Sequence, residues 1–409
     1  MVPKLRFYRF LNNDEYKWQS KKITDISKTF IGLVTTMTSS YVDNGVKLIR
    51  NSDIKENYVE KSKLIKLDIS FAEQYGSRKL KSGDVVTVHT GDIGVSAVID
   101  EELDGCLGFA TLNTRPNPTI INSKYLCQYF NSPYNIKYAL SMATGDGRSN
   151  YNLKDFNNAI IPVPCIDEQT KIADFLFSVD EKIALLNKQY NLLSQYKKGM
   201  MQKIFSQEVR FKDENGEEFP EWNSCQLKDV ATRVTRKNKE NNQTILTISG
   251  RDGLVDQMSY FNKQIASKNV IGYYLINNGE FAYNKSYSQG YPMGAIKMLT
   301  NYDRGVVSTL YICFKLNTNQ SNSFFQHYFE SGLQNRSIEK VAQEGARNHG
   351  LLNIGVNDFF DIELQIPSLK EQIKISDYLS ALDDKIAVKK AELDKLKAWK
   401  QGLLQQMFV

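Results

Sequence analysis

A set of lysine and arginine side chains stands in polar, loop-rich stretches of this sequence, where they could bind a polyanion. Phosphate oxygens need such cations, and Arg, Lys, Asn or Gln at the edge of a groove can read bases. The densest run covers residues 231–242, ATRVTRKNKENN. Any one of these residues alone is best interpreted as a solvated surface charge, so the hypothesis of nucleic-acid contact rests on the whole set. The candidates are Lys28, Arg50, Arg78, Lys79, Lys81, Arg115, Arg148, Arg233, Arg236, Lys237, Lys239, Arg251, Lys285, Arg304 and Arg347.

The sequence lacks the motifs of enzymes that modify or cut nucleic acid on their own. It has no Walker A motif, no G-x-G-x-x-G and no Asn-Pro-Pro-aromatic segment. The acidic-acidic-lysine clusters at 180–182 and 383–385 resemble part of a nuclease motif, but both fall in expected long helices, which favours a charged helix face. The three histidines, His89, His327 and His349, are far apart. We therefore expect no catalytic residue, metal or cofactor site in this chain.

Composition and charge indicate an ordinary globular protein of a reducing compartment. A chain of 409 residues exceeds what one hydrophobic core usually serves, so two or more domains are expected. The net charge of +6 and the pI of about 8.7 are compatible with nucleic-acid binding without arguing for it. The five cysteines form no C-x-x-C pair, which disfavours a disulfide framework or a zinc site. With no signal peptide and no long apolar run, we expect a cytoplasmic protein without a membrane contact.

The chain repeats itself at a distance of about 200 residues. Residues 164–184 read PCIDEQTKIADFLFSVDEKIA, and residues 367–387 read PSLKEQIKISDYLSALDDKIA. The match continues from YKKGMMQKIF at 196–205 to WKQGLLQQMF at 399–408. A period this long is far beyond that of a solenoid and indicates a tandem duplication of a domain together with its helix.

Each copy has a similar frame around a dissimilar centre. An LRF segment followed by Trp18 matches a VRF segment followed by Trp222, whereas residues 30–145 and 240–340 share little. This pattern suggests one scaffold that presents two different surfaces. Polar loops with Gly and Arg, at 144–153 and 344–354, stand in equivalent places before the two helical segments. They could contact nucleic acid or only shape the turn into the final strand.

Apolar residues in the two repeated segments recur at alternating steps of four and three, which is a heptad seam. About 38 residues at about 1.5 Å per residue give each helix a length of roughly 57 Å. We expect the helices to pack on each other as an antiparallel pair that separates the globular parts like a ruler. The alternative is that each helix packs on its own domain. The principal seam residues are Ile172, Leu176, Val179, Ile183, Leu193, Ile375, Leu379, Leu382, Ile386 and Leu396.

Two lysines occupy the same seam position in both copies, Lys197 and Lys400. In an antiparallel pair they would lie near Asp377 and Asp174 respectively, which predicts cross-helix ion pairs that fix direction and register. The competing interpretation is two lysines that extend toward solvent and contribute little.

These observations predict an α+β protein with four consecutive parts. Two mixed α/β domains, at 1–163 and 206–366, are separated by two long helices, at 164–205 and 367–409. The helices form an antiparallel coiled coil, and an internal pseudo-twofold repeat relates the two halves.

The doubled frame resembles the specificity subunits of type I restriction–modification enzymes. The segments IPVPCIDEQTKIADFL at 161–176 and IPSLKEQIKISDYL at 366–379 are similar to the two repeated conserved regions of that family, and the resemblance covers the whole chain. It implies two target recognition domains, each of which reads one half of a split asymmetric site in double-stranded DNA. The helix pair would set the spacer between the halves.

The same resemblance implies partners that carry the chemistry. Two modification subunits would hold S-adenosylmethionine and methylate adenine, and restriction subunits would translocate and cleave with ATP and Mg. This chain would then be a non-catalytic DNA-recognition subunit. The main alternative is a coiled-coil protein–protein adaptor without DNA specificity, and a stand-alone nuclease or methyltransferase is disfavoured by the missing motifs.

Overall fold

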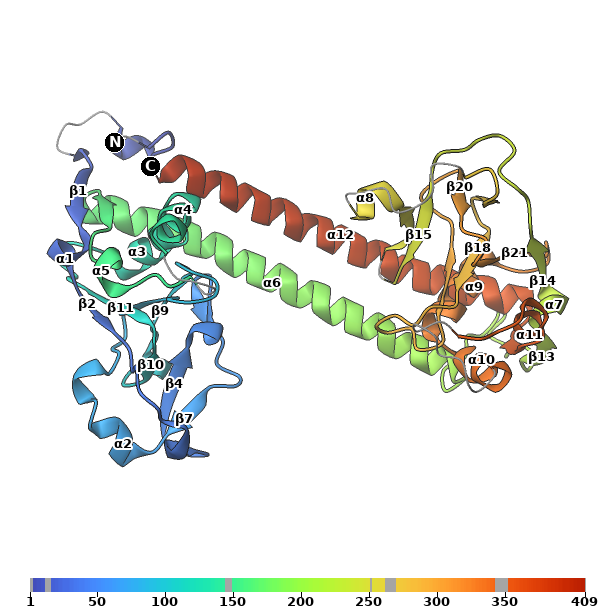
Figure 1. Ribbon diagram of the computed structural model, residues 1–409, viewed down its shortest axis with the longest axis horizontal. Helices are drawn as coiled ribbons and strands as arrows, with labels where there is room; N and C mark the ends of the chain where they lie inside the picture. Colours follow the sequence, from blue (N-terminus) through green and yellow to red (C-terminus); the bar gives the residue numbers. More distant parts are fainter. Residues whose placement is uncertain are drawn as a thin grey trace. The chain divides into compact units, whose positions relative to one another are not determined.

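The computed structural model describes residues 3–11, 16–143, 149–250, 252–261, 270–342 and 352–408. The chain divides into two compact units. Unit 1 comprises Met1–Gln189 with Lys389–Val409, and unit 2 comprises Tyr190–Val388 (Figure 1). The division therefore cuts both long helices near their middles, whereas the sequence-based boundaries set each helix apart as a segment of its own.

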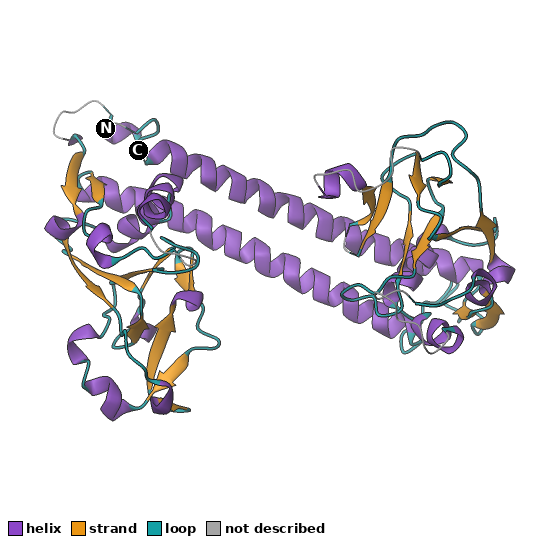
Figure 2. Ribbon diagram, viewed as in Figure 1, coloured by secondary structure: helices purple, strands orange, loops and turns teal. Residues whose placement is uncertain are grey.

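The two long helices are α6 (Ile166–Phe205) and α12 (Leu369–Met407). In each unit a portion of α6 lies beside a portion of α12, and the two run in opposite directions (Figure 2). The predicted fold class, with its antiparallel helix pair, is confirmed. Within the described ranges, no helix combines the length and apolar character that a membrane crossing requires.

The heptad seam lies at the interface of the helices with each other and with the globular parts. Ile172 and Leu176 share one apolar core with Leu403, Leu404 and other residues of unit 1. Six seam residues are buried: Ile172, Leu176, Val179, Ile375, Leu379 and Leu382. The other four are partly buried: Ile183, Leu193, Ile386 and Leu396.

Unit 1 is built on two four-stranded sheets. In the first, the strand order is β2-β11-β8-β9 and all neighbours are antiparallel. In the second, the order is β10-β4-β7-β3, with β10 and β4 parallel. Strand β1 pairs with β12, and β5 with β6. The strands are β1 (Gln19–Lys22), β2 (Ser27–Ile31), β3 (Tyr41–Val42), β4 (Val46–Arg50), β5 (Ile54–Lys55), β6 (Tyr58–Val59), β7 (Ile65–Leu67), β8 (Val85–Thr87), β9 (Ser96–Val98), β10 (Leu107–Phe109), β11 (Leu112–Pro116) and β12 (Ile160–Val163).

The helices of unit 1 join its first sheet to the long helices. The stretch 123–142 forms two helices, because Pro133 cannot continue the first helix and instead opens the second. At the end of α12, the ring of Phe408 lies 5.6 Å from that of Tyr125 and 5.7 Å from that of Tyr129. The short helices are α1 (Ile23–Ile26), α2 (Ile69–Glu73), α3 (Ser123–Phe130), α4 (Pro133–Met142) and α5 (Leu153–Phe156).

Unit 2 repeats the frame of unit 1. Its sheet β14-β21-β18-β19 is fully antiparallel, like the first sheet of unit 1, and the pair β13–β22 corresponds to β1–β12. The pairs β15–β16 and β17–β20 complete it. The strands are β13 (Asn223–Gln226), β14 (Ala231–Val234), β15 (Leu246–Ser249), β16 (Gly253–Asp256), β17 (Tyr274–Asn277), β18 (Phe281–Asn284), β19 (Ala295–Met298), β20 (Arg304–Val307), β21 (Ile312–Leu316) and β22 (Glu363–Ile366).

The end of α6 closes the core of unit 2 as the end of α12 closes that of unit 1. The ring of Phe205 lies 6.4 Å from Trp222, 5.8 Å from Phe324 and 5.7 Å from Tyr328. The terminal phenylalanine of each repeat is therefore an anchor between a long helix and a globular domain. The short helices of this unit are α7 (Leu227–Val230), α8 (Gln257–Phe261), α9 (Asn322–Ser331), α10 (Asn335–Val341) and α11 (Val356–Phe360).

Candidate nucleic-acid interface

The repeated glutamates of the two frames join each N-terminal segment to a long helix. Glu168 is fully buried and receives hydrogen bonds from Arg6, at 2.7 and 2.8 Å, and from the indole of Trp18, at 3.1 Å. Glu371 holds Arg210 in the same bidentate way, at 2.8 and 3.2 Å. Hydrogen bonding to the carboxylate raises the pKa of both arginines. In each copy, the arginine of the LRF or VRF segment and the glutamate of the EQ motif thus form one ion pair, which in the first copy also engages the tryptophan.

The repeated glutamines hold the first turn of a domain helix. The Gln169 side chain accepts from the amide of Asn122, the residue that caps α3, and donates to the carbonyls of Ile120 and Pro164. Gln372 accepts from the amide of Ser321, which caps α9, and donates to the carbonyl of Pro367. These contacts fix the start of α3 and α9 against the long helices.

The repeated lysines of the seam form cross-helix ion pairs, although not with the predicted partners. Lys197 lies 2.5 Å from Asp383, and Lys400 lies 2.5 Å from Asp180. The prediction of Asp377 and Asp174 was wrong by six residues. The seam pattern defines which face a lysine occupies, but the axial stagger of the helices depends on where their ends are anchored in the domains.

Asp180 and Asp383 are also not simple members of a charged helix face. Gln128 of α3 donates to Asp180 at 2.7 Å, and His327 of α9 lies 3.9 Å from Asp383. Gln128 and His327 each stand six residues after the cap of their helix, so they are equivalent positions. Equivalent positions of the two copies therefore build the joints between helices and domains. The surfaces free to differ lie on the globular domains themselves.

Five of the cationic candidates are paired with carboxylates of their own domain. Arg115 makes a bidentate contact with the buried Asp84, and Arg236 lies 2.7 Å from Glu280. Such pairs orient loops of the domain, so these side chains are already engaged. The pairs are Arg50–Asp53, Lys79–Glu73, Arg115–Asp84, Arg236–Glu280 and Arg304–Glu240.

Three further candidates donate to main-chain carbonyls. Arg78 donates to the carbonyl of Gly32, Lys237 to that of Gly272, and Lys285 to that of Ile354 at 3.4 Å. The ammonium group of Lys237 also lies 4.3 Å from the ring centre of Tyr274. These hydrogen bonds help to hold the conformation of the loops in which the carbonyl groups lie.

Four further candidates are exposed on the domains, as the paired Arg236 and Arg304 also are. Lys28 lies on β2 and Arg233 on β14, which are edge strands of the equivalent sheets, while Lys81 and Lys239 lie in loops. Although β2 and β14 hold the same place in the two frames, Lys28 corresponds in register to Thr232 and lies one position before the equivalent of Arg233. The two charges therefore point to opposite faces of their strands. The remaining three candidates, Arg148, Arg251 and Arg347, lie outside the described residues.

The turns after β8 and β18 mark a corresponding edge of each domain. The carbonyl of His89, just after β8, accepts from the amide of Tyr151, and the carbonyl of Lys285 accepts from the amide of Leu352. These bonds attach the ends of the segments 144–153 and 344–354 to this edge. Most residues of the two segments lie outside the described ranges. In unit 1 the side chain of Thr90 also donates to Asn150, at 2.6 Å.

A polar hollow of about 650 Å³ borders this edge in unit 2, and sequence reasoning missed it. Tyr291 donates to the carbonyl of Gly250 and to Glu330, which also binds Lys297. Burial raises the pKa of the Tyr291 phenol, so it is a donor at neutral pH. The signal in the sequence is the polar segment SYSQGYP at 286–292, which has no basic residue. The lining is Ser249, Gly250, Asp252, Tyr260, Ser288, Gln289, Tyr291 and Glu330.

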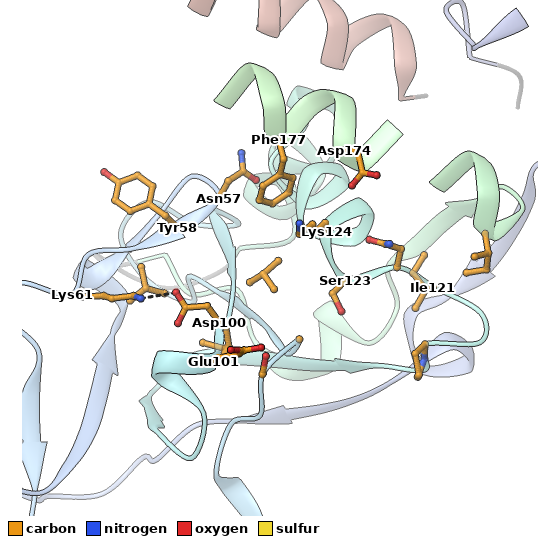
Figure 3. Close-up of a pocket in the computed structure, with 18 residues that line it drawn as sticks. Asn57, Tyr58, Lys61, Asp100, Glu101, Ile121, Ser123, Lys124, Asp174 and Phe177 are labelled. Carbon is orange, nitrogen blue, oxygen red and sulfur yellow. Dashed lines mark ion pairs between the residues drawn. The ribbon is translucent and has the colours of Figure 1, made fainter. Parts of the chain in front are cut away.

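A larger hollow of about 720 Å³ lies in unit 1 between the globular domain and α6. Lys61 and Asp100 form an ion pair on its wall, away from Asp174 (Figure 3). Lys124 stands 5.3 Å from the ring centre of Phe177. Since the wall also carries the carboxylates of Asp100, Glu101 and Asp174, it is a poor place for a polyanion. The exposed sheet edges and turns are the better candidate surface for nucleic acid.

Comparison with known proteins agrees with this division into two equivalent halves. Residues 15–195 and residues 220–398 each match the type I restriction modification DNA specificity domain. The type I restriction enzyme MjaX specificity subunit of Methanocaldococcus jannaschii is 25% identical, over 99% of this chain and 97% of that protein. The type I restriction enzyme EcoBI specificity subunit of Escherichia coli is 28% identical over 32% of this chain and 28% of that protein.

Solved structures share the fold across the full length. The S subunit of a type I restriction-modification system from M. genitalium has a TM-score of 0.59 and 16% identity, and covers 100% of this chain and 99% of its own. A structure from work on complex assembly and conformational transition of the type I R-M system has a TM-score of 0.51 and 16% identity, over 96% of this chain and 97% of its own. Since the family model matches both repeats and most of the sequence, the chain belongs to the type I restriction modification DNA specificity family.

Proposed function

We propose that this chain is the DNA-specificity subunit of a type I restriction–modification complex, which recognises a bipartite asymmetric site in double-stranded DNA. Each globular domain reads one half of the site, and the helix pair sets the spacer. One observation carries the proposal: matching ion pairs, Arg6–Glu168 and Arg210–Glu371, hold two domains whose remaining structure differs. A shared frame with unlike surfaces is what a reader of two unlike half-sites requires.

The cations available for DNA support this reading. Lys28 and Arg233 are exposed on corresponding strands, where they could contact phosphates and so position the domains, and polar turns elsewhere on the domains could contact base edges. Affinity for DNA would then fall steeply with salt, because each phosphate contact releases counterions. As a subunit that acts on cellular DNA, the chain would work in the cytoplasm.

We further propose that two modification subunits bind the long helices at equivalent faces. Tyr196 and Trp399 stand at the same position of the two repeats and are about half exposed, at 52% and 49%. Beside Trp399, a hollow of about 430 Å³ has an apolar floor of Leu186 and Leu396 and a mostly basic rim. Exposed aromatic anchors of this kind are typical of binding hot spots. Two equivalent faces suit two copies of one partner.

The chemistry in this proposal belongs to the partners. The modification subunits would hold S-adenosylmethionine and methylate adenine, and restriction subunits would cleave with ATP and Mg. This chain would contribute recognition and assembly and no catalytic group. A coiled-coil adaptor without DNA specificity is the competing function, and it gives no reason for two unlike domains on one repeated frame.

The test is to express the full chain with its modification subunit and to sequence the methylated adenines in the host DNA. One split asymmetric motif with a fixed spacer is the expected result. Replacing residues 1–163 by the corresponding domain of another specificity subunit should change one half of the motif and leave the other intact. A stable complex that leaves all DNA unmethylated would favour the adaptor instead.

A further inference from the structure

The two lysine joints differ in one respect, although the frame repeats. Lys400 is 4% exposed and is held between two carboxylates, Asp180 at 2.5 Å and Glu56 at 2.6 Å. Among the described residues, the equivalent Lys197 has one carboxylate partner, Asp383, which is 47% exposed. The second carboxylate of the first joint comes from the globular domain, whereas the residue that the domain contributes to the other joint is His327, 3.9 Å from Asp383.

Glu56 belongs to the tight turn of the β5–β6 hairpin, residues Ile54–Val59. Its neighbour Asn57 has φ of +67°, a left-handed conformation that Asn tolerates better than most residues. The amide of Asn57 donates to the carbonyl of Ser96 on β9, at 2.9 Å. The turn is therefore bonded to the first sheet of unit 1 through its main chain.

The side chain of Asn57 also reaches the helices. Its Nδ2 donates to Asp180 on α6 at 3.0 Å, while its Oδ1 accepts from Asn131 at 2.8 Å. Gln128 of α3 donates to the same Asp180 at 2.7 Å. Glu56, Asn57, Gln128, Asp180 and Lys400 thus make one polar node that joins the hairpin, α3, α6 and α12.

Such a node defines geometry more than it adds stability. The Lys400 ammonium group and the Asp180 carboxylate are largely withdrawn from water, whereas the Glu56 side chain is 43% exposed. The cost of removing the hydration of Lys400 and Asp180 largely offsets their attraction. Burial accordingly raises the pKa of Asp180 even though Lys400 lies beside it. Directional hydrogen bonds from three donors, however, allow only one placement of the turn against the helices.

We propose that the hairpin Ile54–Val59 is a positioning element, in which Glu56 and Asn57 set the angle between the first recognition domain and the helix pair. This rests on the proposed function: the angle fixes where that domain meets DNA and hence the spacer length that the subunit accepts. In unit 2 the position of Gln128 is taken by His327, which contacts Asp383, and Asp383 is the carboxylate partner of Lys197 there. The two lysine joints therefore differ in the residues that the globular domains contribute to them.

The experiment uses the full chain with its modification subunit and maps methylated adenine at sites with the native spacer and with spacers one base pair shorter or longer. The variants are Glu56→Gln and the double change Glu56→Gln with Asn57→Ala. The matched control is Glu60→Gln, because Glu60 follows the same hairpin and its carboxylate accepts from the amide of Ser62. We expect both half-sequences to be retained in the variants and methylation at altered spacers to rise about tenfold, as the loss of one charge-assisted hydrogen bond permits.

A merely structural role would lower methylation equally at every spacer, and that result, like an unchanged spacer preference, would overturn the proposal. A second readout does not depend on the function. Spin labels at Lys63 and Lys188, in a chain whose half-buried Cys165 and Cys225 are replaced by Ser, report the distance between domain and helix. The distance distribution should broaden in Glu56→Gln and stay narrow in Glu60→Gln. If wild-type DNA shows no split motif, the proposed function fails, and these distances still decide whether the hairpin positions the domain.

Discussion

The ammonium group of Lys197 lies 2.5 Å from a carboxylate oxygen of Asp383, across the pair of long helices. The same contact recurs between Lys400 and Asp180, and both members are displaced by 203 residues. An ion pair that repeats with its donor and acceptor exchanged between the helices is a direct mark of pseudo-twofold symmetry.

A double-mutant cycle on Lys197 and Asp383 should show a coupling of about 1 kcal/mol, because the pair is partly exposed and screened by solvent. The measurement is urea unfolding of Lys197→Ala, Asp383→Ala and the double variant. The same cycle on Lys197 and Asp377 should show no coupling, since that aspartate is not the partner. Equal coupling in both cycles would contradict the observed stagger of the helices.

The buried ion pair Arg6–Glu168 should contribute much more to stability than the neighbouring exposed pair Arg9–Asp167. Glu168→Gln leaves Arg6 buried without a counter-charge and should lower the free energy of unfolding by about 3 kcal/mol. Asp167→Asn is the control, because the Asp167 side chain is 70% exposed and lies 3.8 Å from Arg9. Its effect should stay below about 0.5 kcal/mol. Comparable losses of unfolding free energy in the two variants would mean that burial of the Arg6–Glu168 pair is unimportant.

Stability should depend on pH through His327. Burial and the nearby Lys197 lower the pKa of His327 to about 4, against an ordinary value of 6.5. Between about pH 6.5 and pH 4, the imidazole of this histidine is protonated in the unfolded state but not in the folded state. The free energy of unfolding therefore falls as the pH drops from about 6.5 toward 4. The loss approaches about 3 kcal/mol at the lower end.

His327→Gln places at this position the residue found in the other repeat, Gln128, and should remove that loss. Unfolding by urea at pH 7 and pH 5 in both proteins measures it. His89→Gln serves as a comparison, because burial also lowers the pKa of His89, but that ring is only partly buried and is hydrogen-bonded to Thr90. A pH dependence that persists in His327→Gln would assign the effect to other groups.

Among the cationic candidates, exposed and paired residues should behave differently. Arg233→Ala should weaken binding to any DNA and lower the slope of log K against log salt by about 0.9, the value for one phosphate contact. Arg115→Ala should instead destabilise the fold, because it leaves the buried Asp84 carboxylate without its counter-charge. Filter binding at several salt concentrations, together with thermal unfolding, separates the two. An unaltered salt slope in Arg233→Ala would remove that residue from the interface.

The exposed aromatics of the helices should contribute to binding of the modification subunit. Tyr196→Ala and Trp399→Ala should each weaken binding at one of two sites by about tenfold, as expected for anchor residues. Calorimetric titration with the modification subunit gives the affinity and the number of sites. Lys188→Ala, an exposed change on α6, should leave both unaltered. A single site unaffected by either aromatic would place the partner elsewhere.

The sequence by itself determined the repeated frame and the two long helices. Heptad spacing of residues such as Leu176 and Leu379 dictates a helix with one apolar face, and a duplicated pattern dictates two similar joints. Local periodicity is enough for these features, because they depend on neighbours within one or two helical turns.

Tertiary structure alone decided which charges meet. Arg115 pairs with Asp84 and Arg236 with Glu280, so side chains that looked available for DNA are engaged within their domains. Asp383, rather than Asp377, faces Lys197, because the stagger of the helices follows from where Phe205 and Phe408 are anchored in the two cores. Contacts between distant segments depend on the packing of whole elements, and spacing along the chain does not specify that packing.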